Sequence, residues 1–190
     1  RLPALLKETM AGCENFRLVM GDVLKIDLAA LLREEFGDMP VAVCANLPYY
    51  ITSPILMRLL EEKLPIRHIT VMVQKEAAER ITAAPGTRLA GAISYGVYYY
   101  AEPRLLFHVQ PGSFYPPPKV TSSVIQLKIR PRPAVDTPDE AGLFRLVRAA
   151  FSQRRKTAAN SVASGLGVEK PGWPRLWIRR ACPPPSGLNS

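Results

Sequence analysis

Short apolar runs with β-branched residues recur along the first 75 residues, a pattern typical of strands buried in a parallel sheet. The predicted strands are 18–20, 41–47 and 68–74. Apolar residues at helical spacing lie around and between these runs. The predicted helices are 1–10, 28–35 and 53–63. Strands that alternate with helices favour a doubly wound α/β sheet.

The pattern changes after two further predicted helices, 75–83 and 91–101. The segments 104–110 and 123–129 are typical of antiparallel edge strands. Between them, residues 111–119 include four prolines. Because proline cannot donate a ladder hydrogen bond, this stretch is unsuited to a central strand.

A proline-rich segment separates this part from the C-terminal residues. Three prolines lie within 130–139 and indicate a linker. Apolar residues then recur at helical spacing, namely Leu143, Phe144, Val147 and Phe151. The predicted division is therefore a core at 1–130, a linker at 131–139, and a small basic helical domain with an irregular tail at 140–190.

Length and composition exclude several classes of protein. With 190 residues, 47% of them hydrophobic, the chain can bury a core, but it has no run of eighteen apolar residues for a membrane span. Its three cysteines and two histidines are scattered, so we expect no disulfide framework, no metal and a reducing, cytoplasmic setting. The chain starts with Arg1 inside a predicted helix, so we expect a fragment that begins within a domain.

The positive charge is concentrated in the second half of the chain. Residues 1–103 hold 11 Lys and Arg against 12 Asp and Glu, whereas residues 104–190 hold 14 against 4, so the excesses are −1 and +10. Clustered cations favour a polyanionic partner, because they release counterions condensed on a phosphate backbone. The alternative is a solvated basic surface.

The tetrapeptide Asn46-Leu47-Pro48-Tyr49 directly follows a predicted strand. Ligands of open α/β sheets bind beyond the carboxyl ends of the strands. An exocyclic amine such as adenine N6 has two N–H donors, which the Asn46 side-chain carbonyl and the backbone carbonyl of Leu47 or Pro48 could accept. Tyr49 offers a flat face for the base. Such a site would act by positioning, without a charged base. The alternative is an ordinary strand-to-turn exit.

Five segments, considered together, resemble the ribosomal RNA adenine N6-dimethyltransferases of the 16S type. They are 46–55 (NLPYYITSPI), 21–24 (GDVL), 73–80 (VQKEAAER), 114–124 (FYPPPKVTSSV) and 151–157 (FSQRRKT). The resemblance covers roughly residues 1–165. Several ordered matches are far more specific than any single motif.

The resemblance implies a class I methyltransferase with a Rossmann-like α/β sheet, incomplete at its N-terminus, and a small helical C-terminal domain that binds RNA. It implies transfer of methyl groups from S-adenosyl-L-methionine to N6 of adenines in small-subunit ribosomal RNA, giving N6,N6-dimethyladenosine. The implied partner is the small ribosomal subunit, in ribosome biogenesis, and we expect a monomer.

The same resemblance implies roles for individual residues. Asn46, Leu47, Pro48, Tyr49 and Phe114 would form the catalytic site, with Phe114 stacked on the second face of the base. The cofactor would contact Asp22, Val23 and Asn46. The residues expected on RNA are Lys119, Arg154, Arg155 and Lys156.

The sequence also departs from the family pattern. The family's Gly-rich loop and the acidic residue for the cofactor ribose would precede Arg1, so we expect this polypeptide to bind the cofactor weakly. Beyond Gly167 the pattern is lost. Rival hypotheses are a macrolide-resistance type 23S ribosomal RNA methyltransferase and a non-catalytic RNA-binding assembly module. Leu47 disfavours a DNA adenine methyltransferase, in which Pro-Pro-Tyr is more typical.

Overall fold

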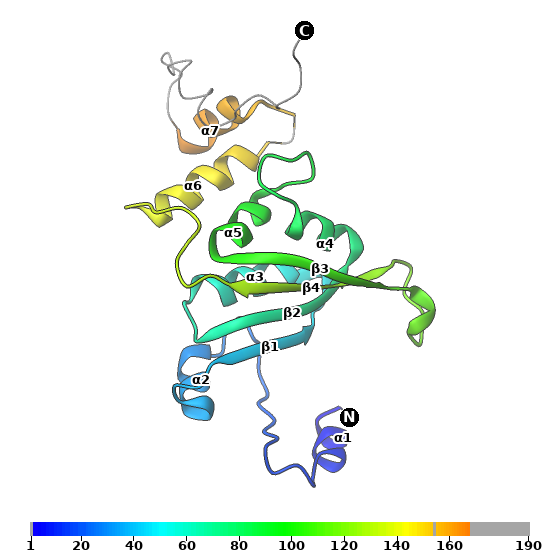
Figure 1. The fold of residues 1–190 in the computed structure, drawn as a ribbon. Helices are drawn as coiled ribbons and strands as arrows, with labels where there is room; N and C mark the ends of the chain where they lie inside the picture. Colours follow the sequence, from blue (N-terminus) through cyan, green and yellow to red (C-terminus); the bar gives the residue numbers. More distant parts are fainter. Residues whose placement is uncertain (1, 154, 168–190) are drawn as a thin grey trace.

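A computed structural model describes residues 2–153 and 155–167 (Figure 1). The elements in chain order are α1 (Leu2–Thr9), α2 (Leu28–Phe36), β1 (Val41–Asn46), η1 (Tyr49–Ile51), α3 (Thr52–Glu61), β2 (Ile66–Gln74), α4 (Lys75–Thr82), α5 (Ala92–Tyr100), β3 (Ala101–Val109), η2 (Pro111–Ser113), β4 (Ser122–Ile129), α6 (Glu140–Phe151) and α7 (Ala158–Leu166). The predicted alternation of helices and strands is confirmed.

The described strands form one mixed sheet in the order β1-β2-β4-β3. Strands β1 and β2 are parallel, whereas β4 runs antiparallel to both β2 and β3. Gln74 at the end of β2 pairs with Ser122 at the start of β4. The end of β1, the end of β2 and the start of β4 therefore share one edge of the sheet.

The hydrophobic core lies against one face of the two central strands. In β2, Ile69, Val71 and Val73 are almost fully buried, and Ile125 and Leu127 of β4 have no exposed surface. Burial alternates along β1 and β2, so their second face is partly exposed in the described structure. Helix α5 contacts both α3 and α4, and all three helices supply buried residues to this core (Figure 1).

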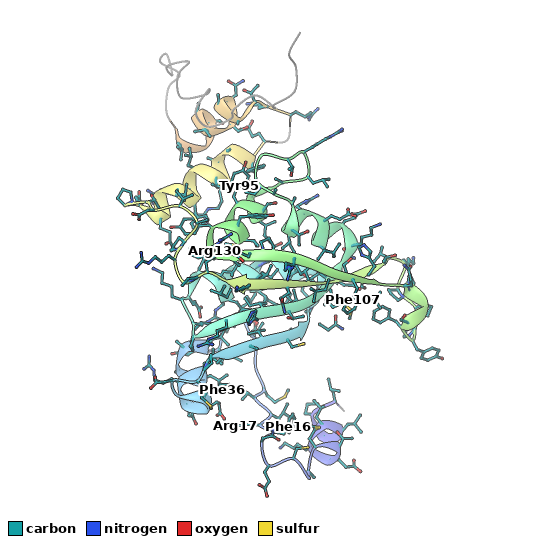
Figure 2. All side chains as sticks on the ribbon, in the orientation of Figure 1. Phe16, Arg17, Phe36, Tyr95, Phe107 and Arg130 are labelled. Atoms are coloured by element: carbon teal, nitrogen blue, oxygen red, sulfur yellow. The ribbon has the colours of Figure 1, made fainter. Side chains whose placement is uncertain are left out.

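Two predicted strands differ in the structure. Residues 18–20 are not a strand, because a strand requires a hydrogen-bonded neighbour and none pairs with them within the described residues. The neighbouring Arg17, labelled in Figure 2, instead forms an ion pair with α2, because its guanidinium lies 3.2 Å from the Glu34 carboxylate. The segment 123–129 is a strand but not an edge strand, since β4 lies between β2 and β3. Only β3 of that pair is at the edge.

Helix α6 packs on the core through an aromatic cluster. The rings of Tyr100 and Phe144 stack at 5.6 Å, and Tyr99 meets both rings edge-on. The hydroxyls of Tyr99 and Tyr100 donate to the Glu140 carboxylate at 3.3 and 2.5 Å. The segment before α6 is also anchored, because the amide of Ala134 donates to the Tyr99 carbonyl at 2.9 Å. The division into domains stays a prediction.

This cluster predicts a loss of stability at high pH. Burial raises the pKa of the Tyr100 hydroxyl, and the hydrogen bond to Glu140 and its negative charge raise it further. Unfolded tyrosine ionises near pH ~10, whereas the folded residue holds its proton to higher pH, so the free energy of unfolding falls as pH rises above about 10. In urea titrations from about pH 10 upward, Tyr100→Phe should flatten this fall by up to about 1.4 kcal/mol per pH unit.

The matched control is Tyr115→Phe, at a side chain that is fully exposed. It should leave the pH dependence of unfolding unchanged. Equal slopes in the wild type and Tyr100→Phe would contradict the assignment of this pH dependence to the buried cluster.

Within the described ranges, no helix is both long and apolar enough to cross a bilayer. In those same residues, no three His, Cys, Asp or Glu side chains gather as metal ligands would.

Candidate active site at the carboxyl edge of the sheet

The 46–49 motif forms a tight turn from β1 into α3. Asn46 ends the strand, and the buried Leu47 donates its amide to the Met72 carbonyl at 3.3 Å. Pro48 is extended, with φ −60° and ψ 131°, and residues 49–51 form one turn of 3-10 helix before α3 begins. The buried Leu47 thus anchors the turn, while Asn46 and Tyr49 remain exposed.

The sequence allowed either the Leu47 or the Pro48 carbonyl as the second acceptor, and the two carbonyls differ in their hydrogen bonds. The Pro48 carbonyl accepts from the amide of Ile51 at 3.2 Å and from the Thr52 hydroxyl at 3.1 Å. A carbonyl oxygen has two lone pairs, so both are used. Within the described residues, the Leu47 carbonyl accepts no hydrogen bond. The geometry therefore favours Leu47 as the backbone acceptor beside Asn46.

Tyr49 connects this turn to the other side of the sheet edge. Its hydroxyl lies 3.1 Å from the hydroxyl of Ser122, which is fully buried at the start of β4. Tyr49 is 41% exposed, so the hydrogen bond holds a side chain that remains accessible. The Lys75 amide donates to the Thr121 carbonyl at 3.0 Å and joins β2 to the same segment.

Phe114 lies in the connection between β3 and β4, directly after η2, and is half-buried. The connection leads into β4 at the edge that carries Asn46 and Tyr49 (Figure 1). Among the described aromatic pairs, the rings of Phe114 and Tyr49 are not in contact. A pocket of about 220 Å³ at this edge is lined by Gln74, Lys75, Glu76, Val120 and Thr121.

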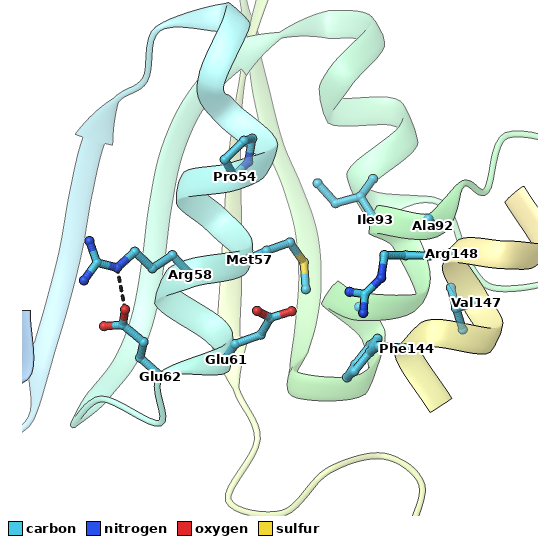
Figure 3. Close-up of a pocket in the computed structure, with 11 residues that line it drawn as sticks. Pro54, Met57, Arg58, Glu61, Glu62, Ala92, Ile93, Phe144, Val147 and Arg148 are labelled. Atoms are coloured by element: carbon cyan, nitrogen blue, oxygen red, sulfur yellow. Dashed lines mark hydrogen bonds and ion pairs between the residues drawn. The ribbon is translucent and has the colours of Figure 1, made fainter. Parts of the chain in front are cut away.

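A larger pocket lies elsewhere, between α3, α5 and α6. Its volume is about 520 Å³, and Met57, Ile93 and Phe144 are among its lining residues (Figure 3). None of the predicted site residues lines it. Size alone therefore does not mark the candidate site, which is defined by its polar groups and position.

Asp22 lies in a compact turn ahead of α2. One carboxylate oxygen accepts the Leu24 amide at 2.9 Å, and the side chain remains 47% exposed. Val23 and Leu24 are half-buried and pack against the core. The other oxygen, Oδ2, lies 3.8 Å from the exposed Lys25 ammonium group. An exposed carboxylate beside apolar side chains fits the adenine end of a nucleoside cofactor, since Oδ2 has a further lone pair that can accept from an exocyclic amine.

The predicted RNA contacts lie in two separate loops. Lys119 is exposed in the β3–β4 connection, and Arg155 and Lys156 are exposed between α6 and α7. Arg154 lies outside the described residues. The structure does not bring Lys119 together with the pair at 155–156 in one loop.

Sequence reasoning missed three residues whose side chains contact the predicted site segments: Thr52, Ser122 and Arg58, whose guanidinium donates to the carbonyls of Val23 and Ile26. Thr52 and Ser122 could have been found, because both lie within the motifs that carry the family resemblance. Arg58 gave no such signal. It lies six residues beyond Thr52, on a helix that was predicted only from its apolar face.

The sheet order and the turn at the end of β1 define a Rossmann-like α/β fold of the class I S-adenosylmethionine-dependent methyltransferases. A solved dimethyladenosine transferase from Plasmodium falciparum matches with a TM-score of 0.64 and 25% identity, over 87% of this chain and 56% of that one. The 23S rRNA methyltransferase ErmE matches with a TM-score of 0.66 and 24% identity, over 86% and 63%. The likeness to ErmE shows the fold alone.

The chain belongs to the ribosomal RNA adenine dimethylase family, whose model matches residues 1–175. It is 48% identical over 162 residues to the ribosomal RNA small subunit methyltransferase A of Alkaliphilus metalliredigens, covering 85% of this chain and 56% of the relative. The protein of the same name from Geobacillus thermodenitrificans is 46% identical over 173 residues, covering 90% and 59%. The chain thus spans less than two thirds of these relatives.

Proposed function

We propose that the protein carrying this chain transfers methyl groups from S-adenosyl-L-methionine to N6 of adenines in small-subunit ribosomal RNA, with N6,N6-dimethyladenosine as the product. The observation that carries the proposal is the position of Asn46 at the carboxyl edge of the sheet, directly before a Leu47 carbonyl that accepts no hydrogen bond among the described residues. The family match and the names of its relatives support the substrate.

In this proposal, the target amine is held by two acceptors. The Asn46 side-chain carbonyl and the Leu47 carbonyl accept its two N–H groups, which directs the nitrogen lone pair toward the methyl group. Pro48 stiffens the turn, and its own carbonyl is held by Ile51 and Thr52. Tyr49 and Phe114 stack on the two faces of the extruded base.

The cofactor, when bound, supplies an electrophilic methyl group. Asp22 would hold its adenine through Oδ2, the carboxylate oxygen that also lies 3.8 Å from the exposed Lys25 ammonium group, and Val23 would pack against the ring. Asn46 lies at the end of β1 and is the residue assigned to both the cofactor and the base. These residues fit the nucleoside end of the cofactor, because they combine an exposed acceptor with half-buried apolar groups.

The partner is ribosomal RNA in the small ribosomal subunit, and the basic residues at 119 and 154–156 bind its phosphates. The +10 excess after residue 103 supports this role. We also propose that the protein is a monomer and acts in the cytoplasm. The rival assembly module without catalysis is disfavoured, because both proposed acceptors are present and Tyr49 is held by Ser122 while it remains exposed.

A transfer assay separates the candidate substrates. The full-length protein that carries these residues is incubated with methyl-labelled S-adenosylmethionine and either unmodified small-subunit or large-subunit ribosomal RNA. Label is expected in the small-subunit RNA. Label only in the large-subunit RNA would favour the 23S alternative, and label in neither would favour the non-catalytic module.

Replacing Arg154, Arg155 and Lys156 with alanine should weaken binding to unrelated RNAs by similar factors, because phosphate contacts carry no sequence information. In filter-binding titrations, the slope of log affinity against log salt should become shallower by roughly two units, for three lost contacts to single-stranded RNA. An unchanged slope would mean that this triplet is a solvated surface.

The matched control removes three exposed cations from the predicted methyltransferase core. Lys7, Arg67 and Arg88 are all exposed in the structure. Their combined replacement by alanine changes the net charge equally and should leave the salt slope close to that of the wild type.

A further inference from the structure

Arg58 contacts the turn that contains Asp22, although it belongs to another part of the chain. It lies on α3, and its side chain is 20% exposed. The guanidinium donates from Nη1 to the Val23 carbonyl and from Nη2 to the Ile26 carbonyl, each at 2.7 Å. Its Nε pairs with Glu62 one turn further along the helix (Figure 3). All three nitrogens of the guanidinium therefore have a partner.

The Asp22 turn is arranged so that these contacts determine its shape. The amides of Lys25 and Ile26 both donate to the Asp22 carbonyl, at 2.8 and 3.0 Å. The carbonyls of Val23 and Ile26 have no other hydrogen bond among the described residues outside regular helices and strands. Arg58 thus donates to the Val23 and Ile26 carbonyls, while the amides of the turn donate to the Asp22 carbonyl.

Helix α3 also holds the motif turn. At its first residue, the Thr52 hydroxyl donates to the Pro48 carbonyl at 3.1 Å. Arg58 follows six residues later, about 9 Å along the helix axis. One rigid helix therefore carries both the group that shapes the Asn46-Tyr49 turn and the group that shapes the Asp22 turn.

We propose that Arg58 is a positioning residue that sets the Asp22 turn for the adenine end of S-adenosylmethionine and couples it, through α3, to the 46–49 turn. This inference rests on the proposed function. Arginine suits the task because its planar fork can reach two carbonyls at once and stays charged at every physiological pH. Lysine offers a single ammonium group, so it cannot reproduce the two-carbonyl bridge with the same geometry.

The test uses the full-length protein with Arg58→Met, which keeps the apolar stem and removes the donors, and with Arg58→Lys. Calorimetry should show roughly tenfold weaker binding of S-adenosylmethionine by Arg58→Met, because the turn must then be ordered on binding. Arg58→Lys should lie between Arg58→Met and the wild type. Without cofactor, hydrogen exchange at the amides of Lys25 and Ile26 should become faster in both variants.

The matched control is Arg67→Met, at an exposed arginine on β2. It should leave both cofactor affinity and amide exchange unchanged. RNA affinity in filter binding should be unchanged in all variants, since Arg58 faces the cofactor turn.

The outcomes separate this inference from the proposed function. Affinity of Arg58→Met within twofold of the wild type, with or without faster exchange, would overturn the positioning role and leave the proposed function intact. A wild-type protein that binds no S-adenosylmethionine would overturn both. If Arg58→Met does not fold, Arg58→Lys gives the same decision, since unchanged affinity there also contradicts the positioning role.

Discussion

Asn46→Ala is expected to lower methyl transfer by at least about a hundredfold, because misplacing a reacting atom by about 1 Å has an effect of this size. Asn46 is exposed at the end of β1 and supplies one of two acceptors for the target amine in the proposed site. Its loss leaves the amine held only by the Leu47 carbonyl. The rate is measured by transfer of labelled methyl groups to small-subunit ribosomal RNA under single-turnover conditions.

The affinity of Asn46→Ala for RNA should stay within about threefold of the wild type, since one contact to a base adds little to binding dominated by phosphates. Cys44→Ala is the matched control, because Cys44 is exposed two residues earlier on the same strand face. It should retain full activity. Transfer by Asn46→Ala within about threefold of the wild type would show that Asn46 does not orient the amine.

Tyr49→Ala is expected to lower the specificity constant for RNA by about ten- to a hundredfold, because stacking of a base on an aromatic side chain contributes about 1–3 kcal/mol. Tyr49→Phe separates the ring from the hydroxyl. It keeps the face for the base but removes the 3.1 Å hydrogen bond to Ser122. Steady-state kinetics with varied RNA should place Tyr49→Phe within about threefold of the wild type. Equal losses in the two variants would assign the effect to the Ser122 contact and exclude stacking.

The strands and helices around the site could be predicted from the sequence because their signals are local. The apolar run that became β1, the helical spacing of α3 and the turn residue Pro48 were sufficient to place the motif at the end of a strand. The segment 18–20 failed because pairing is a property of two strands, and an apolar run does not say whether a neighbour exists. The same reason applies to β4, which was predicted as an edge strand but lies between β2 and β3.

The acceptor geometry of the site required coordinates. Sequence reasoning left the Leu47 and Pro48 carbonyls equivalent, and only the contacts of Ile51 and Thr52 distinguish them. Arg58 was missed for a related reason. Its partners are backbone carbonyls, which every residue carries, so no residue type in the sequence reveals the contact.

Nucleoside mass spectrometry is the most direct test of whether the site methylates N6 of adenine in small-subunit ribosomal RNA. Unmodified RNA is incubated with the full-length protein and deuterated-methyl S-adenosylmethionine, then digested to nucleosides. We expect labelled N6,N6-dimethyladenosine in the wild-type reaction and its near absence with Asn46→Ala. Label on a ring nitrogen, on a ribose or on another base would contradict this expectation.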